Sequence, residues 1–136
     1  MKQKSITQEH PSGCAVACVA YVIGNSYKSA LKLFKRPDYA TSLRGYYCRE
    51  IIKALKNAGL KYNYCYAKPS KLKLLLLDNI IVFIARSKKY PTGHYLARRN
   101  KKWMNPWINF PNIKPAKSGF SKILPGKVQW IIFPLS

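Results

Sequence analysis

The apolar residues of the first half of the chain follow helical spacing. An almost wholly apolar run over 14–23 ends at Gly24, which predicts a central buried helix. Ser12, in the turn that precedes this run, is the expected N-cap of the helix. Two further helices are predicted over 27–35 and 43–58, so the first half of the chain is expected to be mainly helical.

The second half of the chain changes to alternating or short apolar runs, which predict strands. A short helical segment over 69–77 interrupts these strands, and the prolines of 106–126 predict a long loop. Helices first and antiparallel strands later predict an α+β domain, with N-terminal helices packed on a C-terminal antiparallel sheet and residues 1–136 as a single unit. The predicted strands cover 61–67, 79–86, 94–99, 102–105 and 127–133, and the third and fourth pair as a hairpin.

The charge of the chain is strongly unbalanced. Its 136 residues hold 25 Lys and Arg against 4 Asp and Glu, which gives a net charge of +21 at pH 7. So few carboxylates exclude a glycosidase, a two-metal nuclease and an EF-hand, each of which needs several carboxylates at one place. The positive field would attract nucleic acid, an acidic protein or an anionic membrane surface, and it is also what a basic solubilising surface produces.

The four cysteines allow a disulfide framework, a zinc site or a nucleophile. No secretory signal and no membrane-spanning run is recognisable, which disfavours disulfides, and the cysteine spacing does not suit zinc, so we expect no metal or cofactor. Cys14 stands in the first turn of the predicted helix, where free backbone N–H groups and the helix dipole favour a thiolate. Cys18, Cys48 and Cys65 are assigned to packing.

A thiolate nucleophile requires a base, and the chain has two histidines, His10 and His94. His94 is the stronger candidate because it opens a predicted strand, which would hold its imidazole rigidly against the helix N-terminus. Asn105, at the end of the next strand, can orient the imidazole through its amide oxygen. Gln8, six residues before Cys14, can place its amide beside a developing oxyanion.

These residues stand in motifs that resemble a known family. Residues 8–18 (QEHPSGCAVAC) resemble the start of the C39-type bacteriocin-processing peptidases, a branch of the papain-like cysteine peptidases. Residues 92–97 (TGHYLA) resemble the histidine segment of that family, and residues 104–106 (MNP) resemble its later Asp-Pro. The resemblance implies a papain-like fold and a peptide or protein substrate. It also implies Cys14 as nucleophile, His94 as base, Asn105 as its orienting partner and Gln8 as the oxyanion residue.

Three features differ from the usual pattern of the family. Gly13-Cys14-Ala15 replaces the usual Asp-Cys-Gly, Asn105 stands where an Asp is common, and the chain is unusually basic. Papain-like folds of this size also serve as toxins in bacterial competition, acting as peptidases or glutamine deamidases, and such toxins are commonly held by an acidic immunity protein. We therefore expect a reducing cytoplasm as the location, or a target cytoplasm if this is a delivered toxin domain.

Two other functions remain open from the sequence. One is a papain-fold binding module without catalysis. The other is an RNA-binding module or a metal-independent ribonuclease toxin on the same fold, in which a histidine acts beside phosphate-binding cations. The candidate phosphate contacts are Lys88, Lys89, Arg98, Arg99, Lys101 and Lys102, with Tyr90, Tyr95 and Trp103 as stacking rings.

Overall fold

The computed structural model describes residues 4–42, 44–112 and 115–135. Its helical elements are α1 (Cys14–Ile23), α2 (Tyr27–Leu31), the 3-10 helix η1 (Pro37–Ala40), α3 (Cys48–Asn57) and the 3-10 helix η2 (Pro69–Leu76). Its strands are β1 (Tyr62–Tyr66), β2 (Ile80–Ile84), β3 (His94–Arg99), β4 (Lys102–Asn105), β5 (Gly119–Ser121) and β6 (Val128–Pro134).

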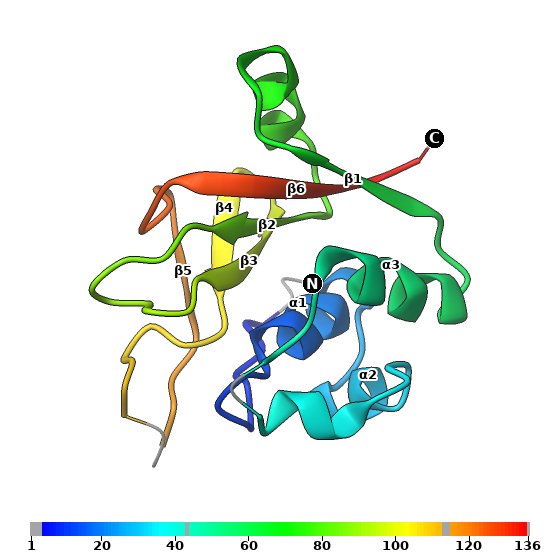
Figure 1. Cartoon of the computed structure of the whole chain (residues 1–136), viewed down its shortest axis with the longest axis vertical. Helices are drawn as coiled ribbons and strands as arrows, with labels where there is room; N and C mark the ends of the chain where they lie inside the picture. Colours follow the sequence, from blue (N-terminus) through cyan, green and yellow to red (C-terminus); the bar gives the residue numbers. More distant parts are fainter. Residues whose placement is uncertain (1–3, 43, 113–114, 136) are drawn as a thin grey trace.

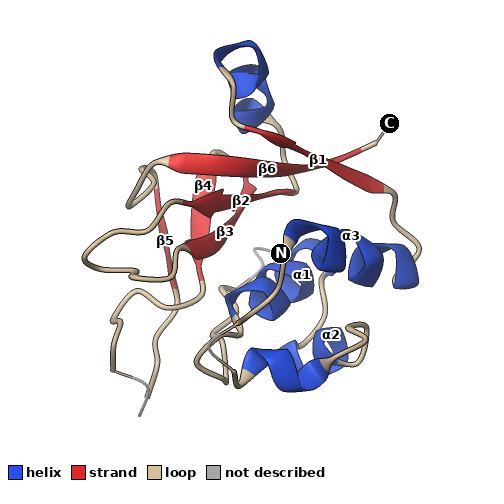
Figure 2. Cartoon of the chain, viewed as in Figure 1, coloured by secondary structure: helices blue, strands red, loops and turns tan. Residues whose placement is uncertain are grey.

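The strands form one six-stranded sheet in the order β1-β6-β2-β3-β4-β5, and every neighbouring pair is antiparallel. The three α-helices gather on one side of this sheet, whereas η2 projects from the far end of β1 (Figure 1, Figure 2). α1 packs against β3, and α3 packs against β1. This arrangement confirms the predicted α+β class, with helices from the first half covering strands from the second.

Alternate residues of β2 belong to two hydrophobic cores, because successive strand residues point to opposite faces of a sheet. Ile81 belongs to the core under the helices, while Ile80, Val82 and Ile84 belong to a second cluster on the other face. Both clusters are closed to water at these positions. β2 and its neighbour β3 are therefore held from both faces, which makes β3 a rigid support for the side chains at its ends.

The central helix α1 has the bounds that the apolar run predicts. Gly24 ends it in the left-handed conformation at φ 74°, and every residue from 15 to 22 is buried. Its start differs in one respect: the N-cap is Gly13, with no side-chain cap. The expected cap, Ser12, instead donates its hydroxyl to the Ser42 carbonyl, which ties the turn before α1 to the segment before α3.

The predicted helix over 43–58 is shorter than expected and begins at Cys48. The Glu50 carboxylate accepts the backbone N–H of Tyr47 at 2.8 Å, which fixes the first turn of α3 there. The residues before Tyr47 are therefore free of helical geometry. The predicted helix over 27–35 likewise ends early, at Leu31, although its predicted cap Ser26 does accept the Ser29 N–H.

The predicted β3–β4 hairpin is confirmed. Asn100 and Lys101 both have positive φ, at 56° and 63°, as a two-residue hairpin turn requires. The predicted loop over 106–126 is wrong in one part, because it contains β5, which pairs with β4 through Met104 and Phe120. Three residues are too short for alternation to show in the sequence.

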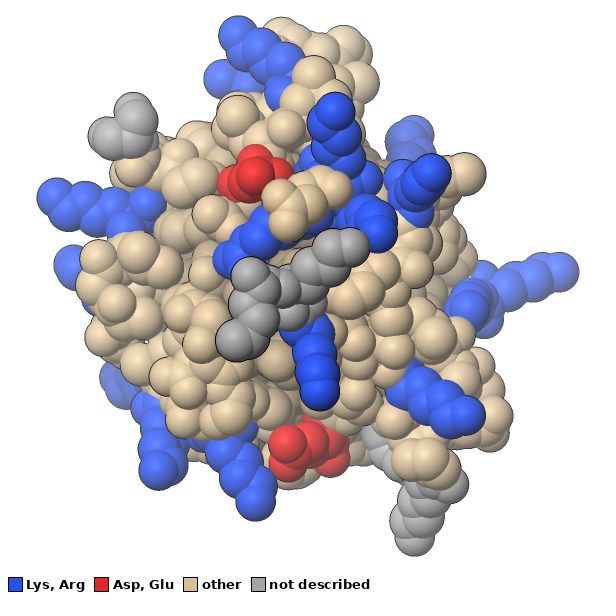
Figure 3. All heavy atoms as spheres, turned by 180° about the vertical axis from the view of Figure 1, so that it is seen from behind, with Lys and Arg blue, Asp and Glu red and all other residues tan. Residues whose placement is uncertain are grey.

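Positive charge is spread over the surface. Figure 3 shows Lys and Arg scattered across one whole face, with small acidic spots between them. Among the described residues there are two ion pairs, Arg36–Asp38 and Arg44–Glu50. None of the helices in the described ranges has the length and apolar character needed to cross a bilayer.

Candidate functional site

The position of Cys14 depends on the glycine before it. Cys14 is the first residue of α1, and Gly13 passes so close to Tyr27 that a Cβ atom on Gly13 would lie 2.0 Å from the Tyr27 hydroxyl. A side chain at position 13 would therefore push the helix start away from α2. The close approach leaves the first N–H groups of α1 beside the thiol, and the backbones of Cys14 and Ala15 both lower the pKa of the Cys14 thiol.

His94 is the first residue of β3 and follows a tight turn. The Gly93 N–H donates to the Tyr90 carbonyl at 2.9 Å, and Gly93 has φ +81°. A Cβ atom on Gly93 would lie 2.1 Å from the Phe83 ring, so glycine is needed both for the backbone conformation and for the space. The turn brings Tyr90 back under the His94 ring, and the two rings are stacked with centroids 4.1 Å apart.

Asn105 orients the imidazole. Its Oδ1 lies 2.7 Å from Nε2 of His94 and also accepts the Trp107 N–H at 3.0 Å. Its Nδ2 donates to the Tyr90 hydroxyl at 3.0 Å, and that hydroxyl donates to the Trp107 carbonyl at 2.8 Å. Every polar atom of the Asn105 side chain thus has a partner, and Nε2 of His94 is occupied, which leaves Nδ1 as the ring nitrogen available to a thiol.

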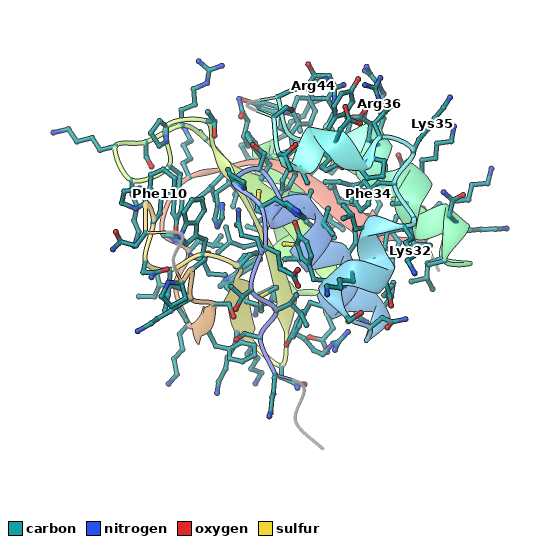
Figure 4. All side chains as sticks on the ribbon, turned by 90° about the horizontal axis from the view of Figure 1, so that it is seen from below. Lys32, Phe34, Lys35, Arg36, Arg44 and Phe110 are labelled. Atoms are coloured by element: carbon teal, nitrogen blue, oxygen red, sulfur yellow. The ribbon has the colours of Figure 1, made fainter. Side chains whose placement is uncertain are left out.

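Cys14 and His94 line the same small pocket, whose volume is about 70 Å³. A backbone hydrogen bond from Tyr95, the residue after His94, lowers the pKa of the Cys14 thiol, so the sulfur lies at the start of β3. The pocket walls come from several loops. Figure 4 shows Phe110 on the loop after β4 and Arg44 on the segment before α3, and both residues line the pocket.

Burial controls the protonation of both groups. Loss of solvent raises the pKa of the Cys14 thiol to about 11, although backbone hydrogen bonds act in the opposite direction. Burial lowers the pKa of His94 to about 4, although the hydrogen bond with Asn105 raises it. The helix N-terminus alone was expected to lower the thiol pKa, and desolvation outweighs that effect. The resting pair is therefore a neutral thiol beside a neutral imidazole at pH 7.

Gln8 lies outside the pocket lining. The residue is 2% exposed, and its Nε2 donates to the carbonyls of His10 at 2.9 Å and Pro11 at 3.2 Å. Both amide hydrogens are thus directed at the turn before α1, while Oε1 is buried without a hydrogen-bond partner. The donors that do stand beside the thiol are the first backbone N–H groups of α1, those of Cys14 and Ala15.

The other histidine and the other cysteines lie elsewhere. His10 Nδ1 is 3.0 Å from the Tyr27 hydroxyl, and His10 does not line the pocket. Cys18 is buried one turn into α1, and Cys48 lies 3.8 Å from the Tyr95 hydroxyl. All four cysteines, including the partly buried Cys65, are free thiols. Among the described residues no three His, Cys, Asp or Glu side chains gather as a metal site would require.

The proposed phosphate contacts do not form one surface. Lys88 and Lys89 lie just before β3, whereas Lys101 and Lys102 lie beyond its other end, and a strand of this length spans about 16 Å. Arg99 donates to the carbonyls of Tyr21 and Val22 and so caps the C-terminal end of α1.

The aromatic rings chosen for base stacking are also placed differently from the expectation. Trp103 is 4% exposed in the second core, where the Arg98 guanidinium lies 5.1 Å from its ring centroid. Tyr90 and Tyr95 are buried as well. Buried rings offer no face to a base, so the stacking role predicted for these three aromatics is wrong.

A larger groove adjoins the pocket, with a volume of about 860 Å³. Sequence reasoning missed it, because part of its wall is the segment before α3 that was predicted as helix. Arg44, Arg49 and Arg86 line this groove together with exposed aromatic side chains. Tyr90 was missed as a support for His94 and Asn105, because no sequence spacing reports a turn that folds a ring under the next strand.

The comparisons with known proteins agree with this arrangement. A sequence profile of the peptidase C39 family matches residues 2–123. Among solved structures, the peptidase domain of Streptococcus ComA, a bi-functional ABC transporter involved in a quorum sensing pathway, matches with a TM-score of 0.61 and 18% sequence identity. That match covers 98% of this chain and 98% of the other. A comparison with curated protein sequences found no match.

The structural match shows the fold and confirms the predicted papain-like α+β architecture. The profile covers most of the chain and identifies the family independently of the fold. The resemblance seen in the sequence motifs is thereby confirmed, and the chain belongs to the peptidase C39 family of papain-like cysteine peptidases.

Proposed function

We propose that this chain hydrolyses a peptide bond with Cys14 as nucleophile, His94 as general base and acid, and Asn105 as the residue that orients His94. The observation that carries the proposal is the 2.7 Å contact between His94 Nε2 and Asn105 Oδ1 beside the pocket that Cys14 lines. The contact fixes the imidazole tautomer and directs Nδ1 away from Asn105, toward the pocket.

The reaction proceeds in two steps. Nδ1 of His94 takes the Cys14 proton while the sulfur attacks the substrate carbonyl carbon, and the electron pair of the carbonyl moves to its oxygen. The C–N bond then breaks, and His94 returns the proton to the leaving amine, which leaves a thioester on Cys14. In the second step a water molecule attacks the thioester, His94 takes its proton, and the Cys14 thiol and a carboxylate product are released.

The neutral resting pair shapes this chemistry. Because burial holds the Cys14 pKa near 11 and the His94 pKa near 4, charge separation occurs during attack and is helped by the mutual attraction of thiolate and imidazolium. The oxyanion would meet the backbone N–H groups of Cys14 and Ala15 at the N-terminus of α1. Gln8, whose amide hydrogens are bound to other carbonyls, is assigned to holding the turn before the helix.

A quenched fluorogenic peptide library of randomised sequence tests the proposal without knowledge of the substrate. We expect the wild type to release fluorescence and the Cys14→Ala and His94→Ala variants to lose at least about 10³-fold of that rate. Cys65→Ser is the matched control, because Cys65 is also a partly buried free thiol but lies on β1, and it should keep the activity. Equal rates in the wild type and Cys14→Ala, or no cleavage by the wild type, would overturn the proposal.

Two further expectations belong to this proposal. We propose that residues 1–136 act as one domain, since the helices of the first half carry Cys14 and the strands of the second carry His94 and Asn105. We also propose a reducing compartment, because oxidation of Cys14 would remove the nucleophile. The toxin setting, the acidic immunity partner and the RNA partner stay predictions from charge alone.

A further inference from the structure

We propose that the groove beside the Cys14–His94 pocket binds a substrate segment rich in acidic side chains, through Arg49 and Arg86. This groove is the one lined by Arg44, Arg49, Arg86, Tyr47, Tyr64 and Trp130, and it is called the arginine groove below. The inference rests on the proposed function, because it treats the groove as part of the path that the peptide follows to Cys14.

The arginine groove is continuous with the pocket. Arg44, Tyr46, Phe83, Thr92 and Tyr95 line both hollows, so no wall separates them. The pocket, at about 70 Å³, holds little more than the groups around one peptide bond, whereas the groove has about 860 Å³. A peptide whose scissile bond lies at Cys14 can therefore extend into the groove, which has room for several side chains.

The charges that line the groove are all positive. No Asp or Glu lines it. Arg44 is compensated, because its Nη1 lies 3.0 Å from Glu50 Oε1 and its guanidinium is held over the Tyr39 and Tyr47 rings. Arg49 and Arg86 are exposed, and among the described residues neither forms an ion pair. Two uncompensated guanidinium groups at the wall of a groove favour carboxylate partners, which they can bind with two parallel hydrogen bonds.

Aromatic side chains supply the rest of the surface. Tyr47 is 48% exposed and Tyr64 is 38% exposed, although large aromatics of this kind are usually buried. Tyr64 lies against Trp130 with centroids 5.9 Å apart, and the Arg49 guanidinium is 5.2 Å from the Tyr47 ring centroid. Exposed rings beside arginine are typical of surfaces that bind a chain through its backbone and the stems of its side chains.

The same chemistry would also accept single-stranded RNA, in which phosphates replace carboxylates and bases stack on the rings. A peptide is favoured here because the groove opens into the pocket of Cys14, whose chemistry acts on a carbonyl group. Binding of an oligonucleotide at the same arginines is therefore treated as an alternative outcome of the test.

The experiment uses full-length protein carrying Cys14→Ala, so that binding is measured without turnover. The probes are three fluorescein-labelled 12-residue peptides that differ only at six positions, which are Glu, Gln or Lys, together with a labelled oligouridylate of the same length. Affinities are measured by fluorescence anisotropy at low and at physiological salt, in the starting protein and in the Arg49→Glu/Arg86→Glu variant. The matched control is Lys56→Glu/Lys122→Glu, which makes the same change in net charge at two exposed lysines outside the groove.

We expect the Glu peptide to bind more tightly than the Gln and Lys peptides. Reversal of Arg49 and Arg86 should weaken this binding by about tenfold or more, and the control reversal should weaken it by less than about threefold, because distant charges are screened by salt. The Glu peptide should also slow alkylation of Cys14 in the wild-type protein. Circular dichroism confirms that the variants, altered only at exposed positions, are folded.

Equal losses in the two charge-reversal variants would overturn the inference, because they would show attraction by the overall field alone. Tighter binding of oligouridylate than of the Glu peptide, with the same dependence on Arg49 and Arg86, would also overturn it. Neither result depends on catalysis. Failure of the proposed function would appear separately, as loss of Cys14-dependent cleavage in the peptide library.

Discussion

The phenol ring of Tyr90 lies flat on the imidazole of His94, with ring centroids 4.1 Å apart and planes within 2° of each other. The same Tyr90 hydroxyl accepts from Asn105 Nδ2 at 3.0 Å and donates to the Trp107 carbonyl at 2.8 Å. One side chain therefore supports both the imidazole and the amide that orients it. This makes Tyr90 a positioning residue for the proposed reaction.

The first prediction separates the two contacts of Tyr90. Tyr90→Phe keeps the stacked ring but leaves Asn105 Nδ2 without its acceptor, so we expect a loss of about 1–2 kcal/mol in the free energy of unfolding and a several-fold fall in kcat with little change in KM. Tyr90→Leu also removes the stack and should lower kcat further. Steady-state kinetics on a peptide cleaved in the library screen, beside urea denaturation, measures both effects. A purely structural role would leave kcat of the folded Phe variant unchanged.

The second prediction concerns Asn105. Replacing its amide by a carboxylate in Asn105→Asp places a negative charge beside Nε2 of His94, which stabilises the imidazolium and raises the pKa of His94 from about 4. The acid limb of the pH profile of kcat/KM should move to higher pH by one unit or more. Asn105→Ala serves as the comparison, because it removes the hydrogen bond without adding charge. An unchanged acid limb in Asn105→Asp would show that His94 does not govern it.

The third prediction tests the helix start. Gly13→Ala places a methyl group 2.0 Å from the Tyr27 hydroxyl, so α1 must shift and stability should fall by about 1–3 kcal/mol. The alkylation rate of Cys14 should change with it, because the thiol moves relative to His94. Adding Tyr27→Phe removes the hydroxyl and should restore part of both losses. No rescue in the double variant would mean that the close contact is not what requires glycine at this position.

The fourth prediction concerns stability in acid. The pKa of His94 is about 4 in the folded chain and 6.5 in its ordinary state, so between these values the unfolded chain binds a proton that the folded chain does not. The free energy of unfolding should therefore fall as the pH falls from about 6.5 to about 4, by roughly 3 kcal/mol from this group. With only 4 Asp and Glu in the chain, few other groups titrate in this range. Urea denaturation of wild type and His94→Gln should show a shallower slope in the variant, and equal slopes would contradict a neutral buried His94.

The fifth prediction concerns Gln8, which the motif suggests as an oxyanion donor. Removal of such a donor costs about 10²–10³ in kcat. Because both Gln8 amide hydrogens are bound to the carbonyls of His10 and Pro11, we expect Gln8→Ala to lower kcat by less than about tenfold and to reduce stability instead. A loss of 10² or more at unchanged stability would return Gln8 to the oxyanion site.

The sequence predicts the parts of this molecule that depend on local signals. The bounds of α1 follow from an apolar run ended by Gly24, and the β3–β4 hairpin follows from alternation around Asn100 and Lys101. The start of α3 could not be predicted in the same way, since helical spacing continues before Cys48 and the Glu50 side chain decides where the helix begins.

The candidate site shows the same division. The order and spacing of Cys14, His94 and Asn105 are visible in the sequence, because each stands at the end of a regular element. The direction of the Gln8 amide and the stack of Tyr90 depend on how a turn folds back, which spacing does not report. The thiol pKa depends on solvent removed by neighbours from four separate elements and loops, so the helix N-terminus alone gave the wrong direction.

The most direct test of the account is the rate at which iodoacetamide alkylates Cys14, followed residue by residue with mass spectrometry in wild type and His94→Gln. We predict that at pH 7 Cys14 reacts at least about tenfold faster in the wild type than in His94→Gln, and that Cys18, Cys48 and Cys65 react at the same slow rate in both. Equal Cys14 rates in the two proteins would contradict the transfer of the thiol proton to His94, on which the proposed peptidase mechanism depends.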